Sequence, residues 1–413
     1  MASLELQSSS SETAQKPQSQ TSHDESNIVK TKTSKTASKK RSFVPRIGCF
    51  RSEPDVDGGP SPVTESGNNG DHHVPTHLVV MVNGITGSAR DWKYAAKQFR
   101  KRFPQDILVH CSECNSSMLT FDGIDIMGER LANEVRSIIE HNPGLQNISF
   151  IGHSLGGLVA RYAIGRLYEQ NLTKQLSEGN GDCKTDGDGN PCLDEKSKGK
   201  IAGLKPMNFV TFATPHLGSR GHKQVPLFCG LYIMEKTASH MSWILRRTGK
   251  HLFLTDSENG KPPLLLQMVN DYGDLPFMSA LQSFRRCVAY SNTCFDCLVG
   301  WSTSSIRRKV ELPKCKHPPK NEKYPHIVNV EAPKISSTEK EAIFEANVNE
   351  HKTINMEEAM IRGLTKVSWE RVDVSFKRSK QRFLAHGTIQ VNTYCVNSDG
   401  ADVISHVIDN FLL

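Results

Sequence analysis

Residues 147–165 read Asn-Ile-Ser-Phe-Ile-Gly-His-Ser-Leu-Gly-Gly-Leu-Val-Ala-Arg-Tyr-Ala-Ile-Gly. Their centre, Gly152 to Gly156, matches the G-x-S-x-G turn that presents a nucleophilic serine between a strand and a helix. The residues before the turn are β-prone, and the apolar residues after it recur at helical spacing. Glycine at positions 152 and 156 lets the strand and the helix approach closely, so that Ser154 can hold a strained backbone with its hydroxyl projecting. We predict that Ser154 is a nucleophile; an ordinary glycine-rich strand–helix junction is the alternative.

Strand-like and helix-like segments alternate along the rest of the chain. The β-prone runs are 78–82, 107–110, 207–213, 287–290 and 372–376. The helical patterns are 91–100, 401–412 and a long amphipathic stretch with Ile126, Leu131, Val135, Ile138 and Ile139 on one face. This alternation predicts an α/β fold, in which helices cover both faces of a mostly parallel, doubly wound sheet. The region 222–284, rich in Leu, Met and Trp, is expected to be helical and to form a cap over the sheet.

Polar residues are concentrated in three stretches of the 413-residue chain. Residues 1–75 are rich in Ser, Thr, Lys, Gly and Pro and lack apolar periodicity, which predicts a disordered tail. Residues 171–203 and 313–350 interrupt the remainder as polar insertions. What is left of 76–413 has normal hydrophobicity and is large enough for one doubly wound domain.

The net charge of +7 owes much to one segment, 30–51, which carries eight Lys or Arg residues and no acidic residue. Such a segment is compatible with peripheral contact with an anionic membrane or with targeting, and a solvated flexible tail is the alternative. We expect no nucleic-acid partner. No apolar run is long enough for a transmembrane helix, and no secretory apolar segment opens the chain. We therefore expect an intracellular, cytoplasmic protein; the serine-rich start leaves an organellar transit peptide open, although its acidic residues argue against one.

The eleven cysteines are scattered and odd in number, which favours reduced thiols. Two C-x-x-C pairs, Cys111 with Cys114 and Cys294 with Cys297, would hold zinc only if they converged on one point. Residues 186–190 resemble the start of a calcium loop, but Pro191 stands where such a loop needs glycine. We expect neither a metal nor a cofactor.

A serine hydroxyl becomes a good nucleophile when a histidine takes its proton and an acid orients that histidine. In α/β-hydrolases the order along the chain is serine, acid, histidine, each on a loop at the carboxyl edge of the sheet. Asp296 follows the expected strand 287–290 and is our choice for the acid. Its rivals, Asp271 and Asp274, precede that strand.

The histidine should lie on a loop near the end of the chain. His386 follows the expected strand 372–376 after a short connection and is preferred to His406, which lies within the final amphipathic helix. For the oxyanion hole we expect the backbone amides of Leu155 and Ile85. His153 and His216, in glycine-containing loops, are expected to shape those loops rather than to react.

Together these motifs resemble the putative serine esterase family of eukaryotic lipase-like α/β-hydrolases, particularly its plant members. The resemblance covers about 76–412. The residues that carry it are Val82 to Ile85, Gly87-Ser88, Asp91-Trp92, Gly152 to Tyr162, Thr214 to Gly218, Asp296, Val299 to Trp301 and Ala385-His386. It implies an α/β-hydrolase fold, the triad Ser154, His386 and Asp296, and esterase or lipase activity on acyl lipids. Cys297 departs from the pattern, since related sequences often have histidine after the aspartate.

The leading hypothesis is a serine hydrolase that cleaves carboxylic esters, with acyl lipids as substrates. A thioesterase or acyltransferase of the same fold would use the same triad, so the sequence does not separate these activities. A non-catalytic scaffold that binds a lipid or a protein is the third hypothesis.

Overall fold

The computed structural model describes residues 74–170, 199–219, 245–258, 260–314, 321–333 and 351–413. The chain divides into two units, Met1–Asn69 and Gly70–Leu413, and all the described residues belong to the second. The predictions for residues 1–73 of the tail, for the basic segment 30–51 and for residues 186–190 lie outside the described residues. So do most of the 171–203 insertion and residues 220–244 of the expected cap.

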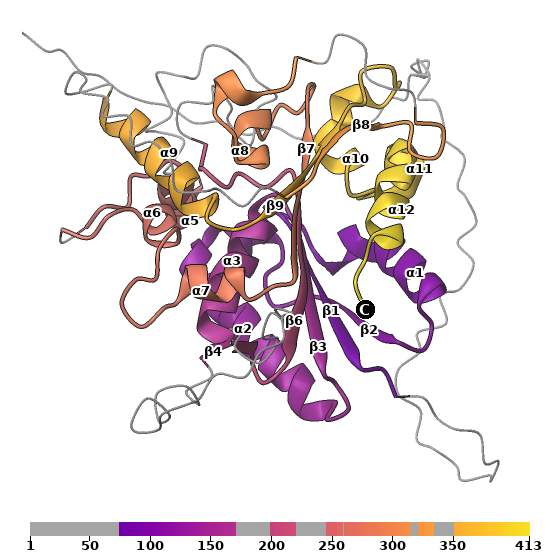
Figure 1. Ribbon diagram of the computed structural model, residues 1–413, viewed down its shortest axis with the longest axis horizontal. Helices are drawn as coiled ribbons and strands as arrows, with labels where there is room; N and C mark the ends of the chain where they lie inside the picture. The colour runs from indigo at the N-terminus through magenta and orange to yellow at the C-terminus, as the bar shows by residue number, and fades with distance from the viewer. Residues whose placement is uncertain (1–73, 171–198, 220–244, 259, 315–320, 334–350) are drawn as a thin grey trace, which may run out of the picture. The chain divides into compact units, whose positions relative to one another are not determined.

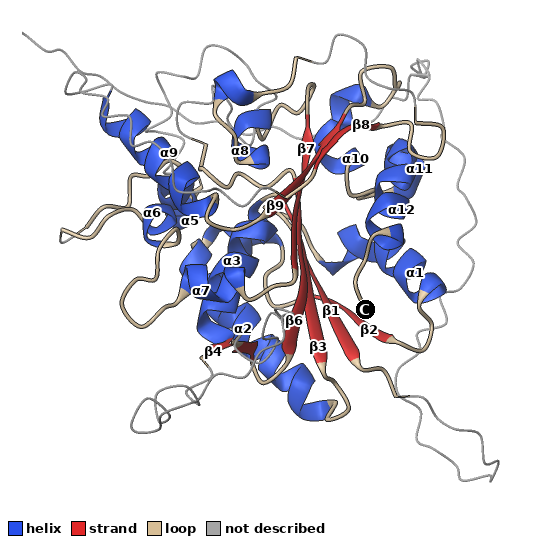
Figure 2. Cartoon of the chain, viewed as in Figure 1, coloured by secondary structure: helices blue, strands red, loops and turns tan. Residues whose placement is uncertain are grey.

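A seven-stranded sheet forms the centre of the domain (Figure 2). Its strand order is β2-β1-β3-β6-β7-β9-β8, and every pairing is parallel except that of β8 with β9. The bounds are β1 (His77–Val82), β2 (Ile107–Cys111), β3 (Asn147–His153), β6 (Lys205–Phe212), β7 (Arg286–Asn292), β8 (Ile327–Glu331) and β9 (Trp369–Val374). The prediction of a mostly parallel α/β sheet is confirmed.

Helices cover both faces of this sheet (Figure 1). The helices α2 (Ile124–His141), α3 (Leu155–Leu167) and α7 (Phe277–Gln282) lie on one face, and α1 (Lys93–Arg102) and α12 (Ala401–Asp409) lie on the other. The remaining helices are short or peripheral: α5 (Arg246–Leu252), α6 (Leu264–Gln267), α8 (Trp301–Ser305), α9 (His351–Leu364), α10 (Ala385–Thr388) and α11 (Tyr394–Asn397). Single 3-10 turns are η1 (Ala89–Trp92), η2 (Ser117–Phe121), η6 (Lys309–Glu311), η7 (Arg382–Leu384) and η8 (Ser398–Gly400).

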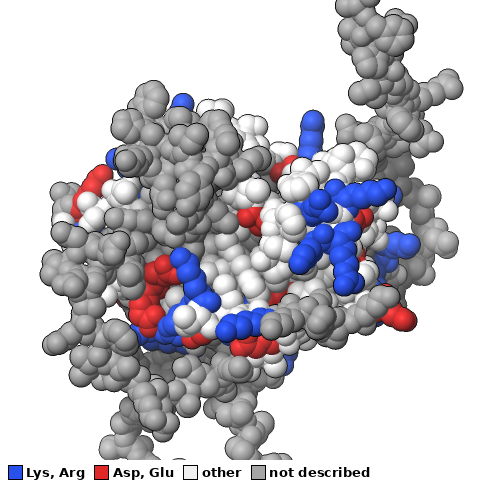
Figure 3. Space-filling model, turned by 90° about the horizontal axis from the view of Figure 1, so that it is seen from above, with Lys and Arg blue, Asp and Glu red and all other residues white. Residues whose placement is uncertain are grey.

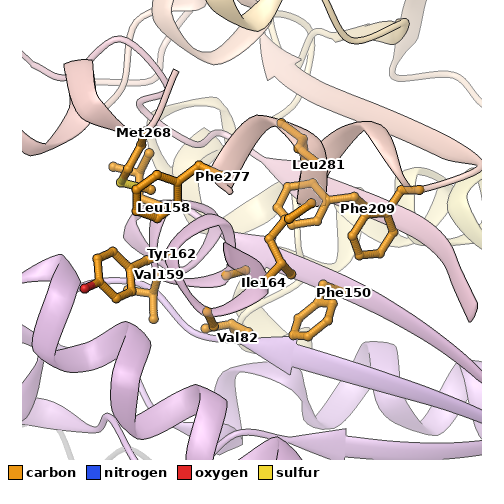
Figure 4. Close-up of a cluster of buried hydrophobic side chains, with 14 of the residues drawn as sticks. Val82, Phe150, Leu158, Val159, Tyr162, Ile164, Phe209, Met268, Phe277 and Leu281 are labelled. Atoms are coloured by element: carbon orange, nitrogen blue, oxygen red, sulfur yellow. The ribbon is translucent and has the colours of Figure 1, made fainter. Parts of the chain in front are cut away.

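Each face of the sheet carries a large hydrophobic core, and β1 contributes alternate side chains to both. Leu78, Val80 and Val82 point toward α2 and α3, whereas Val79 and Met81 point toward α1 and α12. A strand buried on both faces needs a continuous apolar run, as this one has. Figure 4 shows the first core, in which side chains from β1, β3 and β6 meet side chains from α3 and α7.

The predicted inward face of α2 was partly wrong. Leu131 and Val135 are buried as expected, but Ile126 is 36% exposed, and Ile124 and Met127 take the inward positions instead. The helix begins at Ile124, and residues 124, 127, 131 and 135 follow the 3.6-residue period, which places position 126 to one side of that stripe.

Two of the elements that were not predicted from the sequence lie in or directly after the third polar stretch. The strand β8 lies inside the stretch 313–350 that was interpreted as a polar insertion, and α9 follows that stretch. β8 pairs with β9 alone, so it buries little: only Ile327 and Val328 are buried. A short edge strand of this kind lacks the long apolar run by which the central strands were recognised.

The order of the strands places a crevice beside β1 and β3. From β1 the chain crosses to β2 on one side and then returns to β3 on the other, so the direction of winding reverses between these neighbours. In open α/β sheets, ligands bind at the carboxyl ends of strands at such a reversal. Within the described residues, no helix is both long and apolar enough to cross a membrane.

Candidate active site

Ser154 stands at the tip of the turn between β3 and α3. Its backbone is strained, with φ 53° and ψ −125°, a conformation that non-glycine residues rarely adopt. Its amide donates a 2.8 Å hydrogen bond to the carbonyl oxygen of Phe212 at the end of the neighbouring strand β6. The turn has no room for a side chain at Gly156, where a Cβ atom would lie 2.3 Å from the carbonyl oxygen of Val82. Tight contact between backbones therefore fixes the serine above the sheet.

Parallel register brings Asp296 and His386 to the same edge. Asn292 at the end of β7 pairs with Val374 at the end of β9, so the loops that follow both strands leave the sheet together. The Nδ1 atom of His386 lies 3.0 Å from Oδ2 of Asp296. Because an ionised carboxylate only accepts hydrogen bonds, Nδ1 carries the proton in this contact and Nε2 is left as the basic nitrogen.

Asp296 is held from several directions. The backbone amides of Leu298 and Val299 donate to its Oδ1 at 3.0 and 2.8 Å, and the side-chain amide of Asn292 donates to its Oδ2 at 2.9 Å. Burial by itself raises the pKa of Asp296, but the charge of His386 and the hydrogen bonds from His386, Asn292 and Val299 outweigh it. The net pKa lies below the ordinary value. The carboxylate is therefore ionised at neutral pH and available to orient His386.

Ser154 and His386 line one cavity of about 520 Å³ at this edge. Its walls include Gly84 and Ile85 from the loop after β1, and the apolar side chains Phe295, Leu298, Phe383, Leu384 and Val396. A smaller adjoining space of about 20 Å³, enough for one water molecule, is lined by Ser154, Leu155 and Ile85. The residues chosen from the sequence for the oxyanion hole therefore border the space beside the serine.

His153, which was expected only to shape its loop, contacts His386 directly. Its Nε2 lies 2.7 Å from the main-chain carbonyl oxygen of His386, and the two rings are 4.6 Å apart. Burial, followed by the charge of His386, lowers the pKa of His153 to about 3. The ring is therefore neutral, and its Nε2–H donates to the backbone at His386.

Asn292 is a second residue that the sequence analysis missed. Its side-chain amide donates both to Asp296 and, at 3.1 Å, to the carbonyl oxygen of Ala385. It thus connects the acid to the residue before His386. Its position as the last residue of β7 was the one available signal, and nothing in the local sequence distinguishes it from other strand-end polar residues.

Two of the rival residues, Asp271 and His406, are engaged elsewhere. Asp271 accepts hydrogen bonds from the amides of Met278 and Ser279 at the start of α7. His406 lies on α12, where its Nδ1 is 2.8 Å from the hydroxyl of Tyr290. His216 is buried beside Thr211 and against the ring of Trp369. The geometry therefore favours Asp296 and His386, and it gives His216 a place in the core rather than in the cavity.

The two C-x-x-C pairs do not converge. Cys111 ends β2 and Cys114 follows it, whereas Cys294 and Cys297 follow β7, and three strands stand between β2 and β7. Burial raises the pKa of the Cys111 thiol to about 11 and that of Cys114 to about 12. Among the described residues, no group of three or more His, Cys, Asp or Glu is arranged to hold a metal ion.

The strand order, the covering helices and the strand–serine–helix turn at the reversal define an α/β-hydrolase. Residues 72–306 match the model of the family described as putative serine esterase (DUF676), and the chain belongs to this family. The resemblance seen in the sequence is thereby confirmed.

Similar proteins include "Putative lipase ROG1" of Saccharomyces cerevisiae, 28% identical over 239 residues, which are 56% of this chain and 28% of that protein. "Putative lipase C4A8.10" of Schizosaccharomyces pombe is 26% identical over 57% of this chain and 26% of its own length. "Phospholipase A1" of Dinoponera quadriceps is 42% identical over 48 residues, which are 12% of this chain and 13% of that protein. The chain therefore matches less than a third of the length of these relatives.

Solved structures with some likeness include phospholipase PlaB from Legionella pneumophila and lipase BlEst2 from Bacillus licheniformis. The first has a TM-score of 0.31 at 12% identity over 54% of this chain and 39% of its own. The second has a TM-score of 0.29 at 14% identity over 54% of this chain and 37% of its own.

Proposed function

We propose that this protein is a serine hydrolase that cleaves carboxylic esters of acyl lipids. The observation that carries the proposal is the 3.0 Å contact of His386 with Asp296 in the cavity that Ser154 also lines. Family membership agrees with it, because the family is described as one of serine esterases.

In the proposed reaction the hydroxyl oxygen of Ser154 attacks the acyl carbonyl carbon, and Nε2 of His386 accepts the hydroxyl proton. Asp296 orients His386 and stabilises the imidazolium that forms. The amides of Leu155 and Ile85 donate to the tetrahedral oxyanion, helped by the N-terminus of α3. The proton passes from His386 to the leaving alcohol, and water, activated by the same histidine, then releases the acid and frees Ser154.

The walls of the cavity support an acyl chain as the part of the substrate that is bound. Phe295, Leu298 and Val396 offer apolar surface near Ser154, and burial of an acyl chain against such surface is favourable by about 0.8 kcal/mol per CH₂ group. Two relatives that carry the word lipase in their names agree with this substrate class.

A fluorophosphonate probe tests the proposal, because it labels a serine that a neighbouring base has activated. We expect the full chain to be labelled and the Ser154→Ala variant to be unlabelled. The matched control is Ser405→Ala, which removes an exposed serine hydroxyl on α12 and should leave labelling unchanged. Absence of labelling in the full chain would support a non-catalytic scaffold. A panel of oxygen esters and thioesters, with and without alcohol acceptors, separates the esterase from the thioesterase and the acyltransferase.

We also propose that the basic segment 30–51 contacts an anionic membrane. Its support is its composition, eight basic residues without an acid. Deletion of residues 1–73 should then weaken binding to anionic vesicles while soluble ester hydrolysis is retained. Equal vesicle binding by the full and shortened chains would contradict this part.

A further inference from the structure

Exposed apolar side chains surround the mouth of the cavity. Phe383 is 68% exposed, Leu384 51% and Val396 48%, and all three line the cavity that contains Ser154. Tyr394, two residues before Val396, is 55% exposed. Large apolar groups standing in water next to a binding site indicate a surface that something else covers.

A second exposed apolar pair stands on the neighbouring turn η2. Met118 is 59% exposed and Leu119 43%. This turn is fastened to the loop after β1, because the amide of Ser117 donates to the carbonyl oxygen of Gly87 at 3.0 Å and the amide of Thr86 donates to the hydroxyl of Thr120 at 2.9 Å. Thr86 lines the cavity, so η2 is fastened to one wall of the cavity that Phe383, Leu384 and Val396 also line.

Basic side chains adjoin this apolar rim. Lys377, Arg378 and Lys380 are exposed, and none forms an ion pair with another residue in the described part of the chain. No acidic residue occurs between Asp373 and Asp399. Figure 3 views the domain from above, the side of α8 and α10 in Figure 1, and shows Lys and Arg side chains gathered to the right of an uncharged, hollowed region.

Arg382 connects the basic and the apolar parts. Its guanidinium lies 4.9 Å from the ring centre of Phe383 and 5.6 Å from that of Phe295, and these two rings meet edge to face at 5.5 Å. A guanidinium on an aromatic face is a favourable contact. The exposed ring of Phe383 is thereby held at the mouth rather than folded into the cavity.

Polar contacts fix the basic loop to the turn that precedes α12. The hydroxyl of Ser379 donates to the carboxylate of Asp399. The amide of Asp399 donates to Oε1 of Gln381, and Nε2 of Gln381 donates to the hydroxyl of Ser398, each at 3.0 Å. The loop that carries Lys377, Arg378 and Lys380 is therefore a built surface with its charges directed outward.

We infer that residues 377–396, together with η2, dock the protein onto an anionic lipid bilayer with the mouth of the cavity facing the lipid. Lys and Arg side chains on such a surface pair with anionic head groups, and Phe, Leu, Tyr and Met side chains enter the boundary between head groups and acyl chains. The surface consists of residues other than the basic segment 30–51. Its orientation rests on the proposed function, since it presents Ser154 to acyl lipids, but docking itself requires no catalysis.

The test measures vesicle binding of the full-length Ser154→Ala protein, so that no lipid is consumed. Vesicles of phosphatidylcholine alone are compared with vesicles containing phosphatidylserine. We expect binding to the anionic vesicles, and an approximately 100-fold weaker affinity for the triple variant Lys377→Gln, Arg378→Gln, Lys380→Gln, because each basic residue near such a surface contributes about fivefold. Phe383→Ser with Leu384→Ser should also weaken binding, and this loss should persist at high salt.

The matched control neutralises three exposed lysines at the opposite, amino edge of the sheet: Lys101→Gln, Lys200→Gln and Lys205→Gln. It changes the net charge equally and should bind like the parent. Hydrogen exchange then locates the contact: protection upon vesicle binding should appear in peptides covering 377–396. No vesicle binding, equal losses in both triple variants, or protection confined to residues 30–51 would each overturn the inference. Fluorophosphonate labelling is scored separately, so failure of the enzyme proposal and failure of docking are distinguishable.

Discussion

The ring of His153 donates a 2.7 Å hydrogen bond from Nε2 to the main-chain carbonyl oxygen of His386, although 233 residues separate the two along the chain. The residue directly before the proposed nucleophile thus holds the backbone of the proposed base. A displacement of about 1 Å between reacting groups can lower a rate by about 100-fold. His153 is therefore a positioning residue in the proposed mechanism.

Replacing His153 with Phe should lower kcat by roughly 10- to 100-fold and leave KM nearly unchanged, because the ring volume stays and the hydrogen bond to His386 is lost. His153→Gln, whose side-chain amide can donate, should restore part of kcat. The pH midpoint of the acid limb should be the same in all active forms, since His153, with a pKa of about 3, stays neutral across the working range. Steady-state kinetics on a soluble ester measures kcat, KM and the pH midpoint of the acid limb. A shifted midpoint in a His153 variant would contradict the positioning role.

Asp296→Asn should lower kcat by about 10⁴-fold, because the amide group presents a donor where Nδ1–H of His386 needs an acceptor. Circular dichroism and the fluorophosphonate rate should show a folded protein with a slowly reacting serine. The matched control is Asp271→Asn, which alters the start of α7 and should affect stability alone. Equal losses of activity in Asp296→Asn and Asp271→Asn would contradict a role for the contact between Asp296 and His386 in the reaction.

Lowered pH should remove the stabilising contribution of Asp296. Its pKa is lower in the folded state than in the unfolded chain, so the contribution is fully present above the unfolded value of 3.8 and is lost as the pH falls through the folded value. The difference in free energy of unfolding between the wild type and Asp296→Asn should therefore be constant above about pH 5 and shrink as the pH falls below 3.8. Urea unfolding between pH 3 and 7 measures this difference in free energy. A difference that grows as the pH falls would contradict the prediction.

His77 should lower the stability of the domain between pH 6.5 and 4, a higher range than that in which Asp296 acts. It is 1% exposed, its Nε2 lies 2.8 Å from the hydroxyl of Ser149, and burial lowers its pKa from 6.5 to about 4. The folded state favours the neutral ring, so stability is full above pH 6.5 and falls as the pH drops toward 4, by about 3 kcal/mol in total at 1.36 kcal/mol per unit. His77→Gln keeps an amide beside Ser149. Between pH 6.5 and 4, urea unfolding should show that its free energy of unfolding falls by about 3 kcal/mol less than that of the wild type.

Gly156→Ala should disrupt the turn, because the added Cβ atom would lie 2.3 Å and 2.5 Å from the carbonyl oxygens of Val82 and Asn83. Backbone at both points must shift, which should cost about 1–3 kcal/mol of stability and displace Ser154 and Leu155. The control Gly387→Ala adds the same atom beside His386, where the nearest neighbour is 3.6 Å away, and should fold normally. Thermal unfolding together with probe labelling separates the two variants.

Much of the fold was predictable because its signals are local. The central strands are apolar runs that must be buried on both faces, and G-x-S-x-G requires a strand, a turn and a helix at fixed spacing. The edge strand β8 and the choice of which α2 residues face inward were not predictable to the same degree. β8 depends on β9 as its one partner, and the inward face of α2 depends on where the helix begins.

The sequence by itself determined the chemical types at the proposed site and their order along the chain: Ser154, then Asp296, then His386. Tertiary structure decided which acid and which histidine meet, because the register of β7 against β9 brings Asn292 beside Val374 and carries both following loops to one edge. It also decided that His153 and Asn292 hold the pair in place, and that Phe383, Leu384 and Val396 line the cavity. These relationships join residues from different strands and loops, and local sequence patterns carry no information about such long-range contacts.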